Sequence, residues 1–167
     1  MEKTLLIAMT LLIFLINPPH AFADTQAEII QRVNSDTEEI TGLSSAIENV
    51  QDDGEAILKV LMEKIPSVVQ HWKESSNYYL SKISTETDEN LRTILTKINN
   101  DVNGLSSSLL LVEDSINNGD EDAYTSSLDQ YDKYIESINA HVDELNNHYG
   151  VADYSWLAWP FWIALVI

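Results

Sequence analysis

The chain has 167 residues, no cysteine, and 27 acidic against 9 basic residues, which gives a formal net charge of −18. This length suggests one domain. The negative charge argues against nucleic acids and anionic lipid headgroups as partners, because like charges repel. The absence of cysteine excludes disulfides, zinc–thiolate sites and an acylated N-terminal cysteine.

Residues 1–23 have the pattern of a secretory signal peptide. Lys3 provides a basic start, Leu5 to Ile16 form an apolar run, and Ala21-Phe22-Ala23 places small residues where signal peptidase cuts. A helix of this run rises about 18 Å, which is short of the roughly 30 Å hydrocarbon core. We therefore predict cleavage before Asp24 and export of the mature chain. An uncleaved membrane anchor is the alternative.

Residues 24–150 are predicted to form an acidic all-α domain, because their apolar residues recur at the three- and four-residue steps of an amphipathic helix. Turn-forming and capping residues divide this region into four segments. The predicted helices cover about 25–52, 55–83, 86–117 and 120–149. At the first helix, Thr25 followed by Glu28 forms a capping box. Between the second and third helices, Ser84-Thr85 offers an N-cap.

The first two helices each contain one irregularity. In the first helix Val33, Ile40 and Ile47 step by seven, whereas Asp36 interrupts the parallel series that continues at Leu43. In the second helix Pro66 either kinks or splits the segment, because proline lacks the backbone donor and clashes with the preceding turn. The apolar face predicted for the second helix comprises Ile57, Leu58, Leu61, Ile65, Val68, Val69, Trp72, Leu80 and Ile83.

Residues 85–149 read as a helical hairpin with two apolar series on each arm, and every series steps by seven. The first arm carries Leu91, Ile98, Leu105, Val112 and Leu95, Val102, Leu109, Ile116; the second carries Tyr124, Tyr131, Ile138, Leu145 and Leu128, Ile135, Val142, Tyr149. Between the arms, Gly119 fits a left-handed helix end and Asp120 an N-cap. Gly150 fits the end of the second arm in the same way.

Four segments of similar length with short connections predict an antiparallel up-down-up-down four-helix bundle with coiled-coil-like heptads. The alternative merges the first two segments across Gly54 into a longer rod, which would dimerise. From Ile98 to Asp153 the chain has twelve acidic residues and one base, Lys133. Such a face suits a cationic partner or a metal ion, although a solvated face that keeps the protein soluble is the simpler interpretation.

Residues 151–167 form a hydrophobic, aromatic-rich tail whose only charge is Asp153. Tyr and Trp come first and aliphatic residues last, which is the order expected where a chain enters a membrane. The run from Tyr154 is too short to span a bilayer comfortably as a helix. Three interpretations follow. The tail is the start of a transmembrane helix in a longer chain, it inserts partway as an interfacial anchor, or it folds onto the bundle or a partner protein.

His141, Glu144 and His148 are the candidate metal ligands. Their spacing places three donors along one side of the fourth helix, where an acid from a neighbouring helix would complete a divalent metal site. The simpler interpretation is a solvated flank of a polar helix. No Glu-x-x-His pair of the carboxylate-bridged di-metal bundles is present. We therefore predict no resident cofactor.

No motif predicts catalysis. The serines lack a Gly-x-Ser-x-Gly context, and no glycine-rich phosphate loop is present. The aromatic residues at core spacing could line a small ligand pocket. The simpler prediction is that they fill the core and turn their hydroxyls to water. They are Trp72, Tyr78, Tyr79, Tyr124, Tyr131 and Tyr149.

The sequence therefore predicts a non-enzymatic, exported interaction or ligand-sensing module. The tail would hold it at the outer face of the cytoplasmic membrane. In layout the chain resembles the four-helix ectodomains of membrane-bound sensors of the chemoreceptor class, a resemblance of architecture that assigns no functional residue. The alternative function is a structural or assembly coiled-coil subunit, such as a spacer, an adhesin stalk or a component of a membrane complex, that self-associates through its helices.

Overall fold

The computed structural model describes residues 20–50 and 52–150, and this part of the chain is all-helical. It contains α2 (His20–Glu48), α3 (Gly54–Thr85), α4 (Glu89–Asn118) and α5 (Glu121–Tyr149). Most of the predicted signal peptide and the whole predicted tail lie outside the described residues. None of the described helices is both long and apolar enough to cross a membrane.

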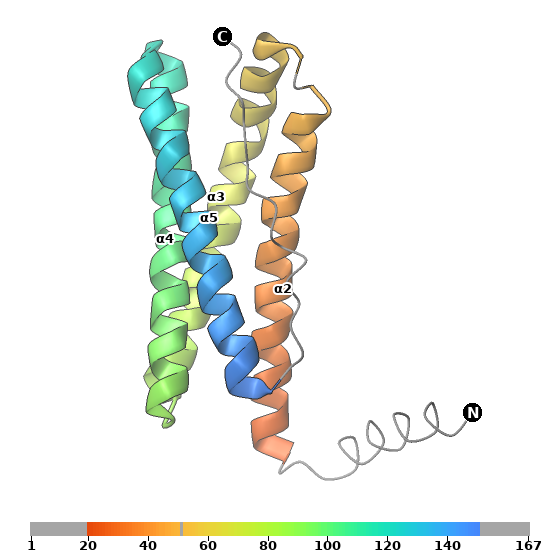
Figure 1. Ribbon diagram of the computed structural model, residues 1–167, viewed down its shortest axis with the longest axis vertical. Helices are drawn as coiled ribbons and strands as arrows, with labels where there is room; N and C mark the ends of the chain where they lie inside the picture. The colour runs from red at the N-terminus through yellow and green to blue at the C-terminus, as the bar shows by residue number, and fades with distance from the viewer. Residues whose placement is uncertain (1–19, 51, 151–167) are drawn as a thin grey trace, which may run out of the picture. The chain divides into compact units, whose positions relative to one another are not determined.

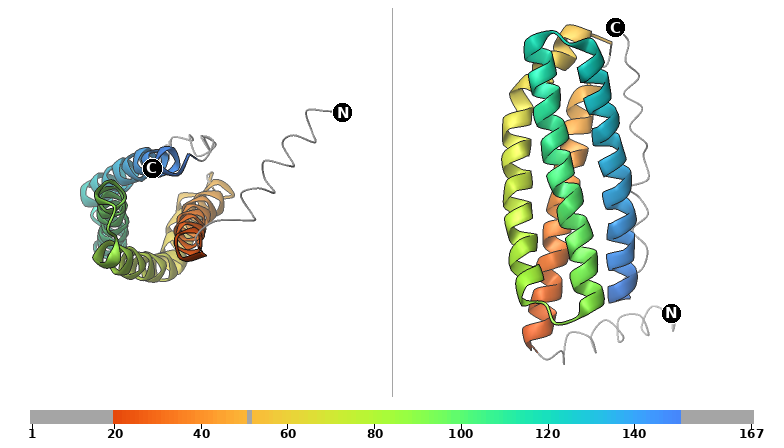
Figure 2. Two further views of the ribbon diagram at one scale, coloured as in Figure 1. Left: turned by 90° about the horizontal axis from the view of Figure 1, so that it is seen from below. Right: turned by 90° about the vertical axis from the view of Figure 1, so that its left-hand side faces the viewer.

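The helices pack against each other in the manner of a four-helix bundle, as the heptads predict (Figure 1). The chain divides within α2, so residues up to Asn34 form one unit and residues from Ser35 form the other. In the second unit, successive helices run in opposite directions, and α4 packs against both α3 and α5 (Figure 2). In the first unit, Ile29 and Val33 are buried, as their spacing predicts.

The apolar stripes of the hairpin form the core. Every residue of the four predicted series is buried except Ile116 and Tyr149, which are half-buried. On α3 the prediction is wrong for Leu58 and Leu80, which are 40% and 50% exposed. Leu58 lies in the second turn of its helix. Leu80 follows the buried Tyr79, and that side chain occupies the core position at this level of α3 instead.

Several predicted helix ends are confirmed. Asp120 caps α5 by accepting the Ala123 N–H at 2.9 Å. Gly119 and Gly150 have φ values of 66° and 65°, in the left-handed region where glycine is favoured. At Gly119 the N–H bonds Ile116 O, which satisfies a carbonyl that the helix itself leaves without a donor.

Other predicted ends are wrong. The helix α2 begins at His20, so Thr25 lies inside it and not at its N-cap. It ends at Glu48, four residues before the predicted end. Asp88, not Ser84 or Thr85, caps α4, because its carboxylate accepts N–H bonds from the first turn. Finally, α3 continues through Pro66 as one helix, so the second segment is not split.

Candidate functional site

The most concentrated group of polar side chains in the described bundle surrounds Asp36, which is 2% exposed. Its Oδ1 lies 2.8 Å from His71 Nε2 and also accepts the Ser75 hydroxyl. Its Oδ2 accepts the Tyr79 hydroxyl at 2.6 Å. An ionised carboxylate only accepts hydrogen bonds, so an ionised Asp36 requires the His71 tautomer that carries its proton on Nε2. Asp36 is thus a buried acceptor shared by side chains of another helix.

Helix geometry explains why one carboxylate can meet all of these groups. His71, Ser75 and Tyr79 follow one another at intervals of four residues on α3, so they lie along one face of that helix. Asp36 comes from the antiparallel neighbour α2 and occupies a core position of its heptad series. Burying a charge is costly unless it is hydrogen-bonded. The α3 donors offset that cost here, and they therefore fix α2 against α3.

Two further links continue this pattern across the bundle. The Ser76 hydroxyl of α3 donates to Asn99 Oδ1 of α4 at 2.9 Å, and both residues are buried. Asp101 of α4 is 5% exposed, and its Oδ2 lies 2.5 Å from His141 Nδ1 of α5. Each pair of consecutive helices is therefore joined by polar side chains.

We call this set the polar belt. Ser75 and Ser76 are adjacent on α3, and Asn99 and Asp101 are two residues apart on α4, so the links lie at one level of the bundle. The polar belt comprises Asp36, His71, Ser75, Ser76, Tyr79, Asn99, Asp101 and His141. Its consequence is structural: sliding any helix by one turn would separate these partners and leave buried polar groups unpaired.

The candidate metal ligands of α5 have separate partners on α4 and at its N-cap. His141 contacts Asp101, as described above. Glu144 bonds Lys97 Nζ at 2.7 Å, and this hydrogen bond lowers the pKa of the Glu144 carboxyl. His148 Nε2 lies 3.6 Å from an Asp88 carboxylate oxygen. Among the residues that the structure describes, no group of three histidine, aspartate or glutamate side chains is placed to hold a metal ion.

A zinc titration tests the metal hypothesis directly. We expect the full chain to bind zinc no more tightly than the His141→Ala/His148→Ala variant, because no three candidate ligands converge among the described residues. Competition against a chromophoric chelator measures the affinity. A loss of affinity of roughly tenfold or more in the variant, the size typical of losing a ligand or its support, would restore the metal site.

Four of the six aromatic residues are buried in the core, whereas Tyr78 and Tyr149 are half-buried. The tyrosine hydroxyls do not all turn to water as predicted. Tyr79 donates to Asp36, so its hydroxyl belongs to the polar belt. The Tyr131 hydroxyl is buried and has no hydrogen-bond partner among the described residues, and the same holds for the Trp72 indole N–H. Burial is the main cause that raises the pKa of Tyr131. These side chains act as packing groups.

The group around Asp36 contains an acid, an imidazole and a hydroxyl, as hydrolytic triads do, but the order of contacts differs. In a triad the histidine lies between the acid and the nucleophile and removes the nucleophile's proton. Here the Ser75 hydroxyl donates to the carboxylate itself. Ser75 is also fully buried, so a substrate has no access to its oxygen. The arrangement can hold helices together, and it is not set up to activate a nucleophile.

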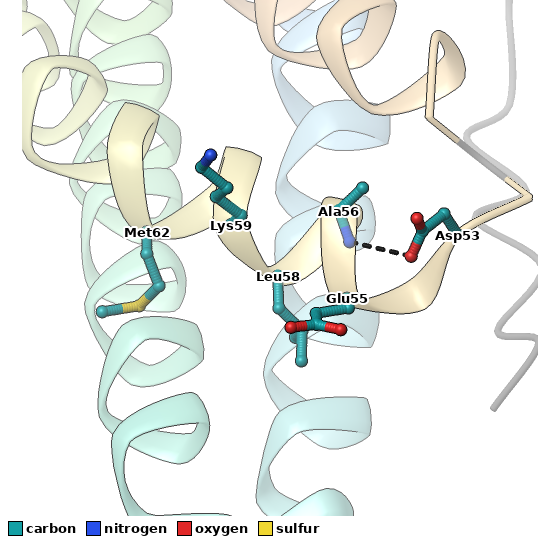
Figure 3. Close-up of a pocket in the computed structure, with 6 residues that line it drawn as sticks. All are labelled: Asp53, Glu55, Ala56, Leu58, Lys59 and Met62. Carbon is teal, nitrogen blue, oxygen red and sulfur yellow. Dashed lines mark hydrogen bonds between the residues drawn. The ribbon is translucent and has the colours of Figure 1, made fainter.

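An open depression of about 530 Å³ lies at the first turns of α3. Its lining is Asp53, Glu55, Ala56, Leu58, Lys59 and Met62 (Figure 3). The Asp53 carboxylate accepts the Ala56 N–H at 3.1 Å, which is the N-cap bond of α3. All lining residues come from one helix and its cap, and none of the predicted site residues is among them. The depression is therefore a shallow part of one helix surface and not a cleft between helices.

The outward face of α5 is strongly acidic. Asp132 is half-buried there, and its pKa is raised from 3.8 to about 6, first by burial and then by the charges of Asp129 and Glu136. Those two residues lie three before and four after Asp132, so all three carboxylates share one side of the helix. The charged form of Asp132 is therefore disfavoured in the folded protein.

Replacing Asp132 by asparagine should stabilise the protein at neutral pH. A raised folded-state pKa means that stability falls as pH rises from about 4 to 6, because the folded carboxyl must lose its proton later than the unfolded one. The asparagine variant escapes this loss, and after allowance for solvent screening we expect a gain of about 1 kcal/mol at pH 7.5 and none below pH 4. Urea unfolding at several pH values measures it. A stability gain that does not depend on pH would refute this explanation. An equal stability gain for Asp143→Asn, at an exposed position, would refute it as well.

Comparison with protein-family models, with curated proteins and with solved structures gives no match to this chain. The interpretation of the polar belt and of the acidic surface therefore depends on their geometry.

Proposed function

We propose that the protein is a non-enzymatic, extracytoplasmic interaction or ligand-sensing module that residues 151–167 hold at a membrane. The observation that carries this proposal is the polar belt. The buried acids Asp36 and Asp101 and the half-buried imidazoles of His71 and His141 are groups that catalysis would need, and they are engaged in holding helices together. The protein then acts through its surface, and that surface is acidic.

The location in this proposal follows from the two ends of the sequence. A signal-peptide pattern in residues 1–23 directs the chain out of the cytoplasm. The aromatic-to-aliphatic order of residues 151–167 suits entry into the outer leaflet. Charge repulsion keeps an acidic domain outside the membrane away from anionic headgroups, so its helix surfaces are accessible to a partner.

A structural coiled-coil subunit is the second candidate. In such a subunit the heptad stripes would meet stripes of other chains. Here the stripes on α4 and α5 are buried within one chain. This observation favours the single-chain module over assembly through the heptads.

Membrane fractionation tests the proposed anchor. We expect the full chain to stay in the pellet through an alkaline carbonate wash, whereas a chain ending at Gly150 is released as a soluble, helical protein. The C-terminal segment would then supply the membrane attachment, because apolar burial in the bilayer survives the high pH that removes peripheral proteins. Release of both chains would refute the anchor, and retention of both would place the attachment elsewhere.

A further inference from the structure

The outward face of α4 differs from every other helix surface in the described bundle because its exposed residues carry no charge over five turns. We call it the α4 face, and its exposed residues are Thr93, Thr96, Asn100, Asn103, Ser107, Leu110 and Leu111. The charges within this stretch are Lys97, which pairs with Glu144, and the buried Asp101. In the right-hand view of Figure 2, α4 runs across the front between α3 and α5.

The α4 face consists mostly of short polar side chains, and removing water from them costs little free energy. The hydroxyls of Thr93, Thr96 and Ser107 each donate to the carbonyl four residues earlier on α4. The Asn103 side-chain amide does the same toward Asn99 O. These polar groups remain satisfied when water is removed, so covering them costs little. At one end of the face, Leu110 and Leu111 are 43% and 47% exposed, which gives apolar area to bury.

Charge identifies the partner. In a molecule of net charge −18, two copies repel wherever acidic faces approach, and the α4 face avoids this. Beyond its two ends, the nearest exposed charges are Arg92, which lies 3.5 Å from Glu89 of its own helix, and Asp114. In an antiparallel pair of α4 helices with a two-fold axis near Asn103, Arg92 of each copy lies opposite the partner's Asp114. The same arrangement sets Leu110 near the partner's Thr96 methyl.

We propose that the α4 face is a self-association surface, on which two copies meet antiparallel with their two-fold axis near Asn103. The contact is isologous, so the same residues serve both copies. One helix face provides an interface near the lower limit for stable complexes, roughly 1,000 Å² in total. A weak, concentration-dependent dimer follows. This inference does not depend on the membrane anchor.

Cysteine cross-linking tests the axis, because the chain has no cysteine of its own. In the full chain, solubilised in mild detergent, Asn103→Cys should form a disulfide-linked dimer roughly tenfold faster than Ser126→Cys, since the contact raises the local thiol concentration. Ser126 is exposed on α5 and serves as the matched control. Equal rates for the two variants, or a cross-link from Asn103→Cys to a different protein, would overturn the proposal.

A charge swap tests the register. In chains that carry Asn103→Cys, adding Arg92→Glu should slow dimer formation several-fold, because it sets like charges against the partner's Asp114 twice. Adding Asp114→Arg as well should restore the rate. Unchanged rates, or slowing without rescue while circular dichroism shows a folded bundle, would overturn the antiparallel pairing. If Asn103→Cys proves unstable, the same charge substitutions are made in the chain without the cysteine. Sedimentation equilibrium then measures the dimer dissociation constant.

Discussion

Replacing Asp36 by alanine is expected to lower the free energy of unfolding by about 3–5 kcal/mol. The substitution removes a buried acceptor and leaves the His71, Ser75 and Tyr79 donors facing one another without it. Breaking a buried charged network costs this much, because each orphaned group keeps its desolvation penalty and loses its bond. Urea unfolding followed by circular dichroism measures the loss.

Two comparisons separate this effect from a general sensitivity of α2. Glu38→Ala removes an acid two residues away at an exposed position, and we expect a change within about 0.5 kcal/mol. In the second comparison Asp36→Leu is combined with His71→Leu, Ser75→Ala and Tyr79→Phe. This variant should recover most of the stability, because an apolar core needs no partners. A loss below about 1 kcal/mol for Asp36→Ala would show that the contacts stabilise little.

Much of the fold was predictable because heptad spacing reports burial directly. Residues such as Leu95, Val102 and Leu109 have few alternatives to the core once a helix forms, and they are buried. Turns were predictable where one residue type suits one conformation, as Gly119 does. The errors lie at helix ends. Several residues near Ser84 could cap the next helix, and the choice of Asp88 depends on tertiary packing.

The polar belt was only partly predictable. Asp36 could be recognised in the sequence because it interrupts an apolar series, and a carboxylate at a core position needs partners from another helix. No sequence pattern indicates that Ser75, Ser76 and Asn99 are buried. A buried serine and an exposed serine look alike until the neighbouring helix is placed. The metal hypothesis for α5 included an acid from a neighbouring helix but did not identify it. Spacing on one helix does not show which residues lie opposite, here Asp101 and Asp88.

Gly104→Ala is expected to destabilise the bundle by up to about 2 kcal/mol, although alanine favours helices. The Tyr134 ring of α5 covers Gly104 of α4 so closely that an added Cβ would overlap Tyr134 Cε1. The ring must move, and overpacking of this kind costs about 1–3 kcal/mol. The better helix propensity of alanine returns about 1 kcal/mol. Urea unfolding gives the net change.

Another glycine in a helix interior supplies the matched control. Gly42 lies in α2 and is exposed, and an added Cβ there meets nothing within 4 Å. Gly42→Ala should therefore stabilise the protein by about 1 kcal/mol, since only helix propensity changes. In a Tyr134→Ala background the cause of the clash is gone, so Gly104→Ala should become stabilising as well. If Gly104→Ala destabilises the protein equally with and without the tyrosine ring, the close approach of α4 and α5 at Gly104 is not the cause. The Tyr134 ring would then not lie against Gly104.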